Sequence, residues 1–268
     1  MFKTIAYIIK YLRPPHLIKY LFYRMIRNKN IWVESNILGS NARVDLNIGD
    51  FIQYWIFIDG IYEKNVFEFL RKNIGGKILL DLGSNIGTFP LSLFDIAKHV
   101  YAFDASVVNC NLLERNLKKN KIKNVTVVNK AIYEKSGKTL KLYLSKDAMG
   151  NHNLFIRTGE VKKVSTVSLD DFVKSSNLKH VDLIKIDIEG SELTALRGAS
   201  FLLKKIRPTI IIEFNRYMSN WAGYELLDLF DQITKYRYAA CEINGESVSR
   251  KDVINDKTFN RNLVFTPL

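Results

Sequence analysis

The sequence predicts an α/β protein organised around a mostly parallel, doubly wound sheet. Apolar segments typical of buried strands alternate with stretches of helical periodicity between residues 77 and 215. The first of these segments, residues 78–82, runs into a loop with two glycines and then turns helical, as the start of a βαβ unit does. A chain of 268 residues fits one such domain with extensions.

The first 33 residues differ from the rest of the chain in charge. They contain seven Lys and Arg residues and no Asp or Glu, in a protein with a formal net charge of +13. Apolar residues recur at helical spacing on both sides of Pro14 and Pro15, which predicts a basic amphipathic helical hairpin. We expect residues 1–44 to form an N-terminal extension and residues 45–268 to form the main domain.

This extension has two open interpretations. It lies on an anionic membrane surface, or its apolar faces pack on the main domain while its charges stay in water. No uncharged run approaches the roughly 20 residues of a membrane-spanning helix, and no signal-peptide cleavage site is present. The two cysteines, Cys110 and Cys241, form no disulfide framework, so we expect a cytoplasmic protein, at most peripheral to the inner face of the membrane.

Residues 31–60 are expected to form short strands and turns, and a helix is predicted over residues 63–73. Residues 51–62 are densely aromatic. They are either core or the wall of a ligand pocket, and core is the simpler interpretation because buried aromatic rings mostly serve packing.

The loop after the first strand has the features of a ligand-binding loop. Asp81 ends the strand, and Gly83, Asn85 and Gly87 follow. This spacing differs from the glycine pattern of dinucleotide sites, and Asp81 would repel a phosphate. S-adenosylmethionine, which has a cationic end and no phosphate, suits the loop better than NAD. Asp104 ends the next predicted strand about 20 residues further on, where such folds place the carboxylate that binds ribose hydroxyls. The alternative is an ordinary βαβ turn whose acids cap helices.

Two further segments extend the predicted sheet region. A third strand over residues 124–133 carries Ala131, a further candidate cofactor-binding residue. Residues 139–144 and 161–165 are expected to form a hairpin, and the loop inside it contains His152.

Carboxylates gather where the predicted strands end. The fourth predicted strand leads into Asp187 and Glu189, and the fifth carries Glu213 near its end. Because ligands bind outside the carboxyl ends of the strands in open α/β sheets, we expect these residues to share one edge with Asp81 and Asp104. Like charges gathered at one edge are unfavourable without a partner, so a cationic cofactor or a proton-transfer task is indicated.

Four motifs occur in order along the chain. They are Asp81-Leu-Gly-Ser-Asn-Ile-Gly87, Val100-Tyr-Ala-Phe-Asp104, Thr166-Val-Ser-Leu-Asp-Asp171 and Ile184-Lys-Ile-Asp-Ile-Glu-Gly190. Together they resemble the FkbM-type family of S-adenosylmethionine-dependent methyltransferases, over roughly residues 45–266. The resemblance implies a Rossmann-like class I methyltransferase fold with an antiparallel last strand near residues 261–266. It also places the glycine loop around the methionine part of the cofactor and Asp104, where the family more often has glutamate, at the ribose.

The resemblance further implies an O-methyltransferase that acts on a hydroxyl of a saccharide, glycolipid or related small molecule. An alcohol must lose its proton to a base during such a transfer. Asp187 is our first candidate for the base, and Glu189, Glu213 and His152 are the others. Glu189 could instead cap the next helix, and His152 is more typical of a solvated surface residue.

The acceptor pocket is expected to use variable parts of the chain. These are the N-terminal region, residues 145–160, and an aromatic segment with Tyr217, Trp221 and Tyr224. No residue cluster has the spacing of a metal site, so no metal is expected. A non-catalytic or nucleic-acid-directed protein that binds S-adenosylmethionine is the alternative. Nucleic acid is the less favoured acceptor because the sequence motifs of amino- and carbon-methylating enzymes are missing.

Overall fold

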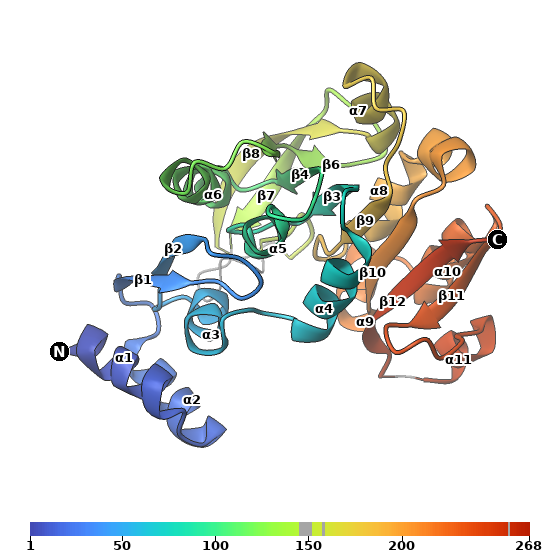
Figure 1. Ribbon diagram of the computed structural model, residues 1–268. Coiled ribbons are helices and arrows are strands. Elements are labelled where there is room, and N and C mark those ends of the chain that lie inside the picture. Colours follow the sequence, from blue (N-terminus) through green and yellow to red (C-terminus); the bar gives the residue numbers. More distant parts are fainter. Residues whose placement is uncertain (145–151, 157–158, 257) are drawn as a thin grey trace.

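The computed structural model describes residues 1–144, 152–156, 159–256 and 258–268. A seven-stranded sheet forms its centre (Figure 1). The strands are β3 (Ile78–Leu82), β4 (His99–Asp104), β5 (Val125–Asn129), β9 (Leu183–Ile186), β10 (Thr209–Asn215), β11 (Tyr238–Glu242) and β12 (Asn260–Pro267). Their order is β11-β12-β10-β9-β3-β4-β5. β12 is antiparallel to both of its neighbours, and the strands from β10 to β5 are parallel. The Rossmann-like fold predicted from the sequence is confirmed.

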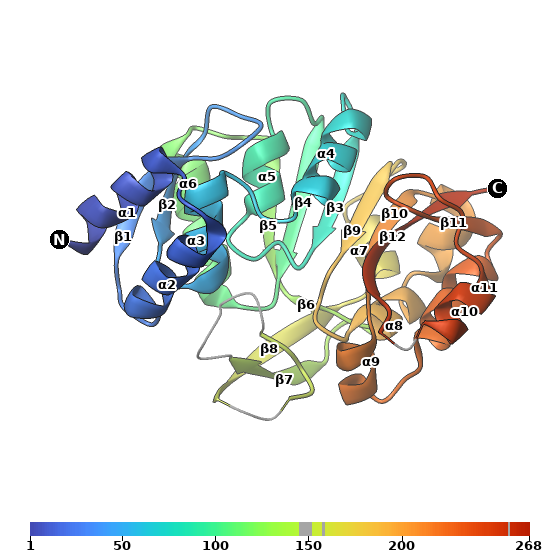
Figure 2. The ribbon, with the colours of Figure 1, turned by 90° about the horizontal axis from the view of Figure 1, so that it is seen from below.

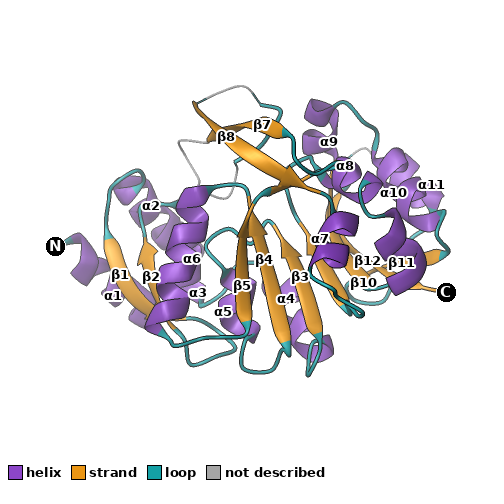
Figure 3. Cartoon of the chain, turned by 90° about the horizontal axis from the view of Figure 1, so that it is seen from above, coloured by secondary structure: helices purple, strands orange, loops and turns teal. Residues whose placement is uncertain are grey.

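Helices cover both faces of this sheet (Figure 3). One core contains side chains of α3 (Phe51–Asp59), α4 (Lys64–Asn73), α5 (Thr88–Leu93) and α6 (Val107–Lys119). The other contains side chains of α7 (Leu169–Ser175), α8 (Glu192–Arg197), the π-helical turn η2 (Leu202–Ile206), α10 (Leu226–Thr234) and α11 (Arg250–Asn255). Along β3, Leu79 faces the first core and Leu80 the second, because successive strand residues point to opposite faces.

A small sheet lies beside the main one. It contains β6 (Ala131–Ile132), β8 (Glu160–Val167) and β7 (Thr139–Leu144) in that order, and β7 and β8 form the predicted hairpin. The predicted third strand is divided between the two sheets, because a tight turn at Lys130, whose N–H donates to the carbonyl oxygen of Val128 at 2.9 Å, separates β5 from β6. Residues 145–151 and 157–158 of the expected acceptor loop lie outside the described residues.

The aromatic segment forms a helix, so the expectation of strands and turns up to residue 60 was wrong there. Asp50 caps α3 by accepting a hydrogen bond from the backbone N–H of Gln53 at 3.0 Å. Tyr54 and Phe57 of this helix are fully buried, so most of the aromatic segment is core, whereas Ile52 and Tyr62 at its two ends line a cavity. Before it, β1 (Trp32–Asn36) and β2 (Arg43–Asn47) form an antiparallel hairpin.

The N-terminal part forms the predicted helical hairpin. α1 (Phe2–Leu12) and α2 (His16–Ile26) lie at one end of the molecule beside α3 (Figures 1 and 2). The domain boundary expected after residue 44 falls inside β2, which pairs with β1.

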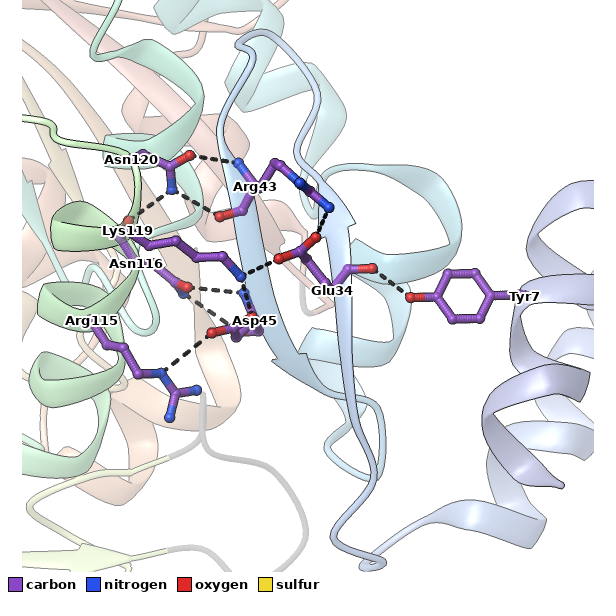
Figure 4. A network of polar contacts seen from close by, with 8 residues as sticks. All are labelled: Tyr7, Glu34, Arg43, Asp45, Arg115, Asn116, Lys119 and Asn120. Atoms are coloured by element: carbon purple, nitrogen blue, oxygen red, sulfur yellow. Dashed lines mark hydrogen bonds and ion pairs between the residues drawn. The ribbon is translucent and has the colours of Figure 1, made fainter.

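Side chains of α6 and of Asn120, the residue that follows it, attach the β1–β2 hairpin to the main domain (Figure 4). Asn120 Oδ1 accepts a hydrogen bond from the N–H of Arg43 at 2.8 Å, and Asn116 Oδ1 accepts one from the N–H of Asp45 at 2.9 Å. Lys119 adds an ion pair to the Asp45 carboxylate at 2.6 Å. These contacts join residues more than 70 positions apart, so the hairpin is a fixed part of the molecule.

Candidate active site

A cavity of about 210 Å³ opens at the carboxyl ends of β3, β4, β9 and β10. Its lining includes Gly83, Ser84, Asn85, Asp104, Asn109, Ala131, His152, Asp187, Glu189 and Glu213. A further wall comes from Tyr62 and Glu63, which precede α4. The cavity therefore gathers most of the residues predicted from the sequence, in the place expected for a ligand of an open α/β sheet.

Gly83 holds the loop after β3 against the end of β9. Its φ is +83°, and a Cβ at this position would lie 1.7 Å from the carbonyl oxygen of Asp187. The N–H groups of Gly83 and Ser84 both donate to the carbonyl oxygen of Phe103, each at 2.9 Å. The loop thus connects the ends of three neighbouring strands, and it does so only with glycine at this position.

We expect Gly83→Ala to lower the free energy of unfolding by at least about 2 kcal/mol, because the added methyl group would overlap a backbone carbonyl. Gly76→Ala is the matched control. Gly76 also has a positive φ, of +68°, but nothing lies within 4 Å of the position of its Cβ. Urea unfolding of both variants separates the overlap from the backbone strain that they share. Equal losses of stability in the two variants would contradict the close approach.

Asp81 and Gly87 lie behind the cavity rather than in its wall. Gly87, with φ +91°, serves packing, because a Cβ there would lie 2.2 Å from Cδ1 of Leu113 in α6. Asp81 is fully buried beneath the loop, and burial raises the pKa of its carboxyl group. Neither oxygen of Asp81 has a hydrogen-bond partner among the described residues, and the same holds for the buried Oδ1 of Asn85.

Asp104 joins the glycine loop to the start of α6. Its Oδ2 accepts a hydrogen bond from the N–H of Asn85 at 2.9 Å. Its Oδ1 accepts hydrogen bonds from the N–H of Ser106 at 2.8 Å and from Nδ2 of Asn109 at 3.2 Å. Burial raises the pKa of Asp104 to about 7, although these hydrogen bonds favour the carboxylate. The residue predicted at the ribose therefore also fixes the shape of the loop.

The catalytic candidates surround a buried lysine. Lys185 is 2% exposed, and its ammonium donates to Oδ2 of Asp187 at 2.9 Å and lies 3.9 Å from Oε2 of Glu63. Burial disfavours the charge of Lys185, but the neighbouring carboxylates outweigh it and raise the pKa of the ammonium. Oδ1 of Asp187 has no hydrogen-bond partner in the described part of the chain, so one oxygen of this carboxylate is held and the other is available.

The two remaining acids of the cavity hold protons at neutral pH. Burial, followed by repulsion from Asp187, raises the pKa of Glu189 to about 8. The same two causes raise the pKa of Glu213 to about 9. A protonated carboxyl group donates as well as accepts hydrogen bonds, so these side chains can bind hydroxyl groups of a ligand in both ways.

These raised pKa values predict a decrease in stability at alkaline pH. The folded protein keeps protons on Glu189 and Glu213 that the unfolded chain releases above about pH 4.5. The stability that they contribute is therefore complete below that pH and is lost as the pH rises through about 8 and 9. We expect Glu213→Gln to raise the melting temperature relative to the wild type by a few degrees, roughly, at pH 9 and by less at pH 5.

Thermal unfolding of this variant and of Glu68→Gln checks the prediction. The side chain of Glu68 is 63% exposed, on α4, which makes it a suitable control. A stability difference for Glu213→Gln that does not change with pH would show that Glu213 keeps no proton in the folded protein.

His152 was expected to be a solvated surface residue, but it is half-buried in the cavity wall. Burial lowers the pKa of its imidazole.

Glu192, rather than Glu189, binds the backbone before α8, because its Oε1 accepts hydrogen bonds from the N–H groups of Ile188 and Gly190. The expected aromatic segment lies in and after α9 (Arg216–Ala222).

Its three aromatic residues have different surroundings. Tyr224 donates a hydrogen bond to Oε2 of Glu192 at 2.9 Å. Tyr217 and Trp221 are exposed and contact each other edge to face, with ring centroids 6.3 Å apart. None of the three lines the cavity.

Lys185 and Glu63 are charged residues of the site that were missed in the sequence. Lys185 stands between two isoleucines of a fully buried strand, and a charged residue in such a run was a usable signal. Glu63 gave no such signal, because it lies more than 120 positions before Asp187 and was assigned to the helix predicted over residues 63–73. Tyr62 belongs to the aromatic segment, for which a pocket wall was the alternative interpretation.

Comparison with known proteins identifies the family. The methyltransferase FkbM domain matches residues 81–239, which is more than half of the chain. The protein belongs to the FkbM methyltransferase family. A further relative is methyltransferase 1 of Beauveria bassiana, which is 26% identical over 176 residues, covering 56% of this chain and 66% of the fungal protein.

Solved structures of similar architecture include two methyltransferases. The methyltransferase FkbM of Methylobacillus flagellatus KT has a TM-score of 0.46 at 21% identity and covers 71% of this chain and 43% of its own. An rRNA methylase of Streptococcus thermophilus has a TM-score of 0.45 at 14% identity and covers 76% of this chain and 94% of its own. This chain thus spans less than two thirds of the fungal and Methylobacillus relatives.

S-adenosylmethionine is the methyl donor of this FkbM methyltransferase, and the residues of the cavity fit it. The loop of Gly83 leaves the backbone free of side chains on its approach to the cavity. The unpaired Oδ1 of Asn85, a residue of the cavity wall, matches a ligand that donates hydrogen bonds, whereas Asp81 lies behind that wall. Asn85, Asp104 and Ala131 would hold the cofactor from the β3 and β4 side, next to Asp187.

Proposed function

We propose that this FkbM methyltransferase transfers a methyl group to a hydroxyl of a saccharide, a glycolipid or a related small molecule. The observation that carries the proposal is the position of Asp187. Its Oδ2 is held by Lys185, and its main chain touches Gly83 of the cofactor loop. A carboxylate held next to the cofactor can receive the proton of an acceptor hydroxyl.

The residues of the cavity have different roles in the proposed methyl transfer. S-adenosylmethionine supplies an electrophilic methyl group when it is bound. The protein must hold the acceptor hydroxyl in line with that group and receive its proton. Oδ1 of Asp187 accepts the proton, and Lys185 keeps the carboxylate in one orientation. Glu189 and Glu213 bind further hydroxyl groups of the acceptor.

The lining of the cavity supports a neutral, hydroxyl-rich acceptor. Tyr62 and the carboxyl groups of Glu63, Glu189 and Glu213 all lie within it. A phosphate group would meet repulsion from the Asp187 carboxylate, which also lines the cavity. The net charge of +13 supports a nucleic-acid acceptor as the alternative. Metal independence also remains a prediction, which activity in the presence of a chelator would check.

Cofactor binding is the first part of the test. Calorimetry should give saturable binding of S-adenosylmethionine, weaker binding by Asp104→Ala, and no binding of NAD. If S-adenosylmethionine binds in this way, a lack of methyl transfer in the experiments that follow would mean that the acceptor is missing and not the cofactor.

Transfer of a labelled methyl group to separate pools of nucleotide sugars, glycolipids and RNA is the second part. Label that appears in a saccharide or glycolipid and survives alkali, as an ether does and an ester does not, supports the proposal. Label confined to the RNA pool would overturn it in favour of the nucleic-acid alternative.

A further inference from the structure

The inner apolar face of the helical hairpin of α1 and α2 packs against the main domain. Ala6 and Ile26 are completely buried in the core next to α3. The ring of Tyr23 packs on that of Tyr54 with centroids 5.3 Å apart, and the hydroxyl of Tyr54 donates to the carbonyl oxygen of Lys19 at 2.7 Å. The hydroxyl of Tyr7 donates to the carbonyl oxygen of Glu34 at 2.7 Å (Figure 4). Packing on the main domain therefore explains one face of the hairpin only.

A second apolar face of the same helices is exposed. On α2, Leu17, Leu21 and Met25 follow one another at four-residue intervals, which places them on one side of the helix, and each is more than half exposed. On α1, Tyr11 and Leu12 are 87% and 67% exposed. Large exposed apolar groups concentrated in one hairpin mark an interaction surface, whereas scattered single ones do not.

Cations accompany this exposed face. Lys3, Arg13, Arg24 and Arg27 have no carboxylate partner among the described residues. The first acidic residue of the chain is Glu34, so nothing within the hairpin itself offsets these charges. The partner of this surface must therefore combine apolar groups with negative charge.

We propose that the outer face of α1 and α2 docks this protein on the surface of an anionic lipid bilayer. Apolar side chains of such a helix enter the boundary between headgroups and acyl chains, while Lys and Arg contact anionic headgroups. Neither helix, nor any other helix in the described ranges, is long and apolar enough to cross a membrane. The hairpin therefore lies on the bilayer, and the attachment to α3 and β1 carries the rest of the protein with it.

The position of the hairpin relative to the cavity supports a lipid partner. A second hollow is lined by Arg13, between the two helices, by His16 at the start of α2, and by Trp55 of α3. Its lining also includes Tyr62 and Glu63, which are walls of the active-site cavity. This hollow therefore links the hairpin to the wall of the candidate active site. The docking itself does not depend on which acceptor is methylated.

Vesicle sedimentation with the full chain tests the proposal, because truncation would expose the aromatic core of α3. We expect at least tenfold stronger binding to phosphatidylglycerol-containing vesicles than to neutral phosphatidylcholine vesicles. Arg24→Gln with Arg27→Gln should weaken binding roughly tenfold or more, since each cation contributes on the order of 1 kcal/mol near an anionic surface. Leu17→Gln with Met25→Gln should weaken it by a similar factor.

Matched controls come from exposed residues elsewhere on the chain. Lys204→Gln with Lys205→Gln removes the same charge, and Ile254→Gln with Val161→Gln removes exposed apolar groups of 48% and 45% exposure. Both controls should bind like the wild type. Equal, negligible binding to the two kinds of vesicle would overturn the proposal, as would control variants that lose binding as much as the hairpin variants. A self-associating protein that becomes monomeric in the hairpin variants and ignores vesicles would assign the face to a second copy of the chain instead.

Discussion

Asp187→Asn is expected to lower the turnover number by about a thousandfold or more and to leave the affinity for S-adenosylmethionine within a fewfold of the wild-type value. Asparagine keeps the shape of the side chain but cannot accept the proton of a hydroxyl, and a positioned general base contributes about 10² to 10⁴ in rate. The main chain of Asp187 contacts Gly83 through its carbonyl oxygen, which the substitution leaves in place. Single-turnover kinetics together with calorimetry measure the two quantities separately.

Asp231→Asn is the control for this variant. Asp231 pairs with Arg250 at 3.0 Å, far from the cavity lining, and its loss should leave turnover unchanged. If Asp187→Asn kept more than about a tenth of the activity, Asp187 would not be the base, and Glu189→Gln, Glu213→Gln and His152→Ala would be compared next.

Lys185→Met is expected to lower the free energy of unfolding by about 3–5 kcal/mol. Removal of one partner from a buried ion pair leaves the other charge without compensation. The side chain of Lys185 is 3% exposed, and its ammonium neutralises Asp187 and Glu63. Methionine fills much of the same volume, so the loss would come from the charge and not from a void. Chemical denaturation measures it.

A double substitution distinguishes this electrostatic effect from misfitting of the methionine. When Asp187→Asn is also present, fewer carboxylates need the ammonium, so Lys185→Met should then destabilise the protein by clearly less. Lys204→Met, at an exposed site of η2, serves as the control. Additive losses, or a melting temperature for Lys185→Met close to the wild-type value, would show that Lys185 does not hold the cluster together.

The order of the elements could be predicted because the strands of this fold are short, apolar and separated by helical periodicity. The helix α3 was missed for a physical reason. Residues 53–58 are buried on every side, so no polar face reveals a helical period, and the aromatic residues favour strands on propensity alone. The cap made by Asp50 and Gln53 was the one local sign of a helix start.

The sequence predicted which edge of the sheet carries the site. It did not predict which acidic groups of the site are charged. Asp187 and Glu189 follow β9, and Glu213 lies near the end of β10, which is the parallel neighbour of β9. The pairing of Lys185 with Glu63 depends on how the segment before α4 returns to the sheet, which tertiary packing decides. Without Lys185, the sequence offered no basis for choosing which acid stays charged.

Several carboxyl groups lie close together around the ammonium of Lys185, and those that are protonated can release their protons to the solvent. Burial, followed by repulsion from the Asp187 carboxylate, keeps protons on Glu189 and Glu213 at neutral pH. A cation that enters the cavity would reduce that repulsion, so part of these protons would pass to the solvent. The heat of cofactor binding would then depend on the ionisation enthalpy of the buffer, and the affinity would rise with pH up to about 9. The protein would in this way exchange protons with its surroundings before any methyl group has moved.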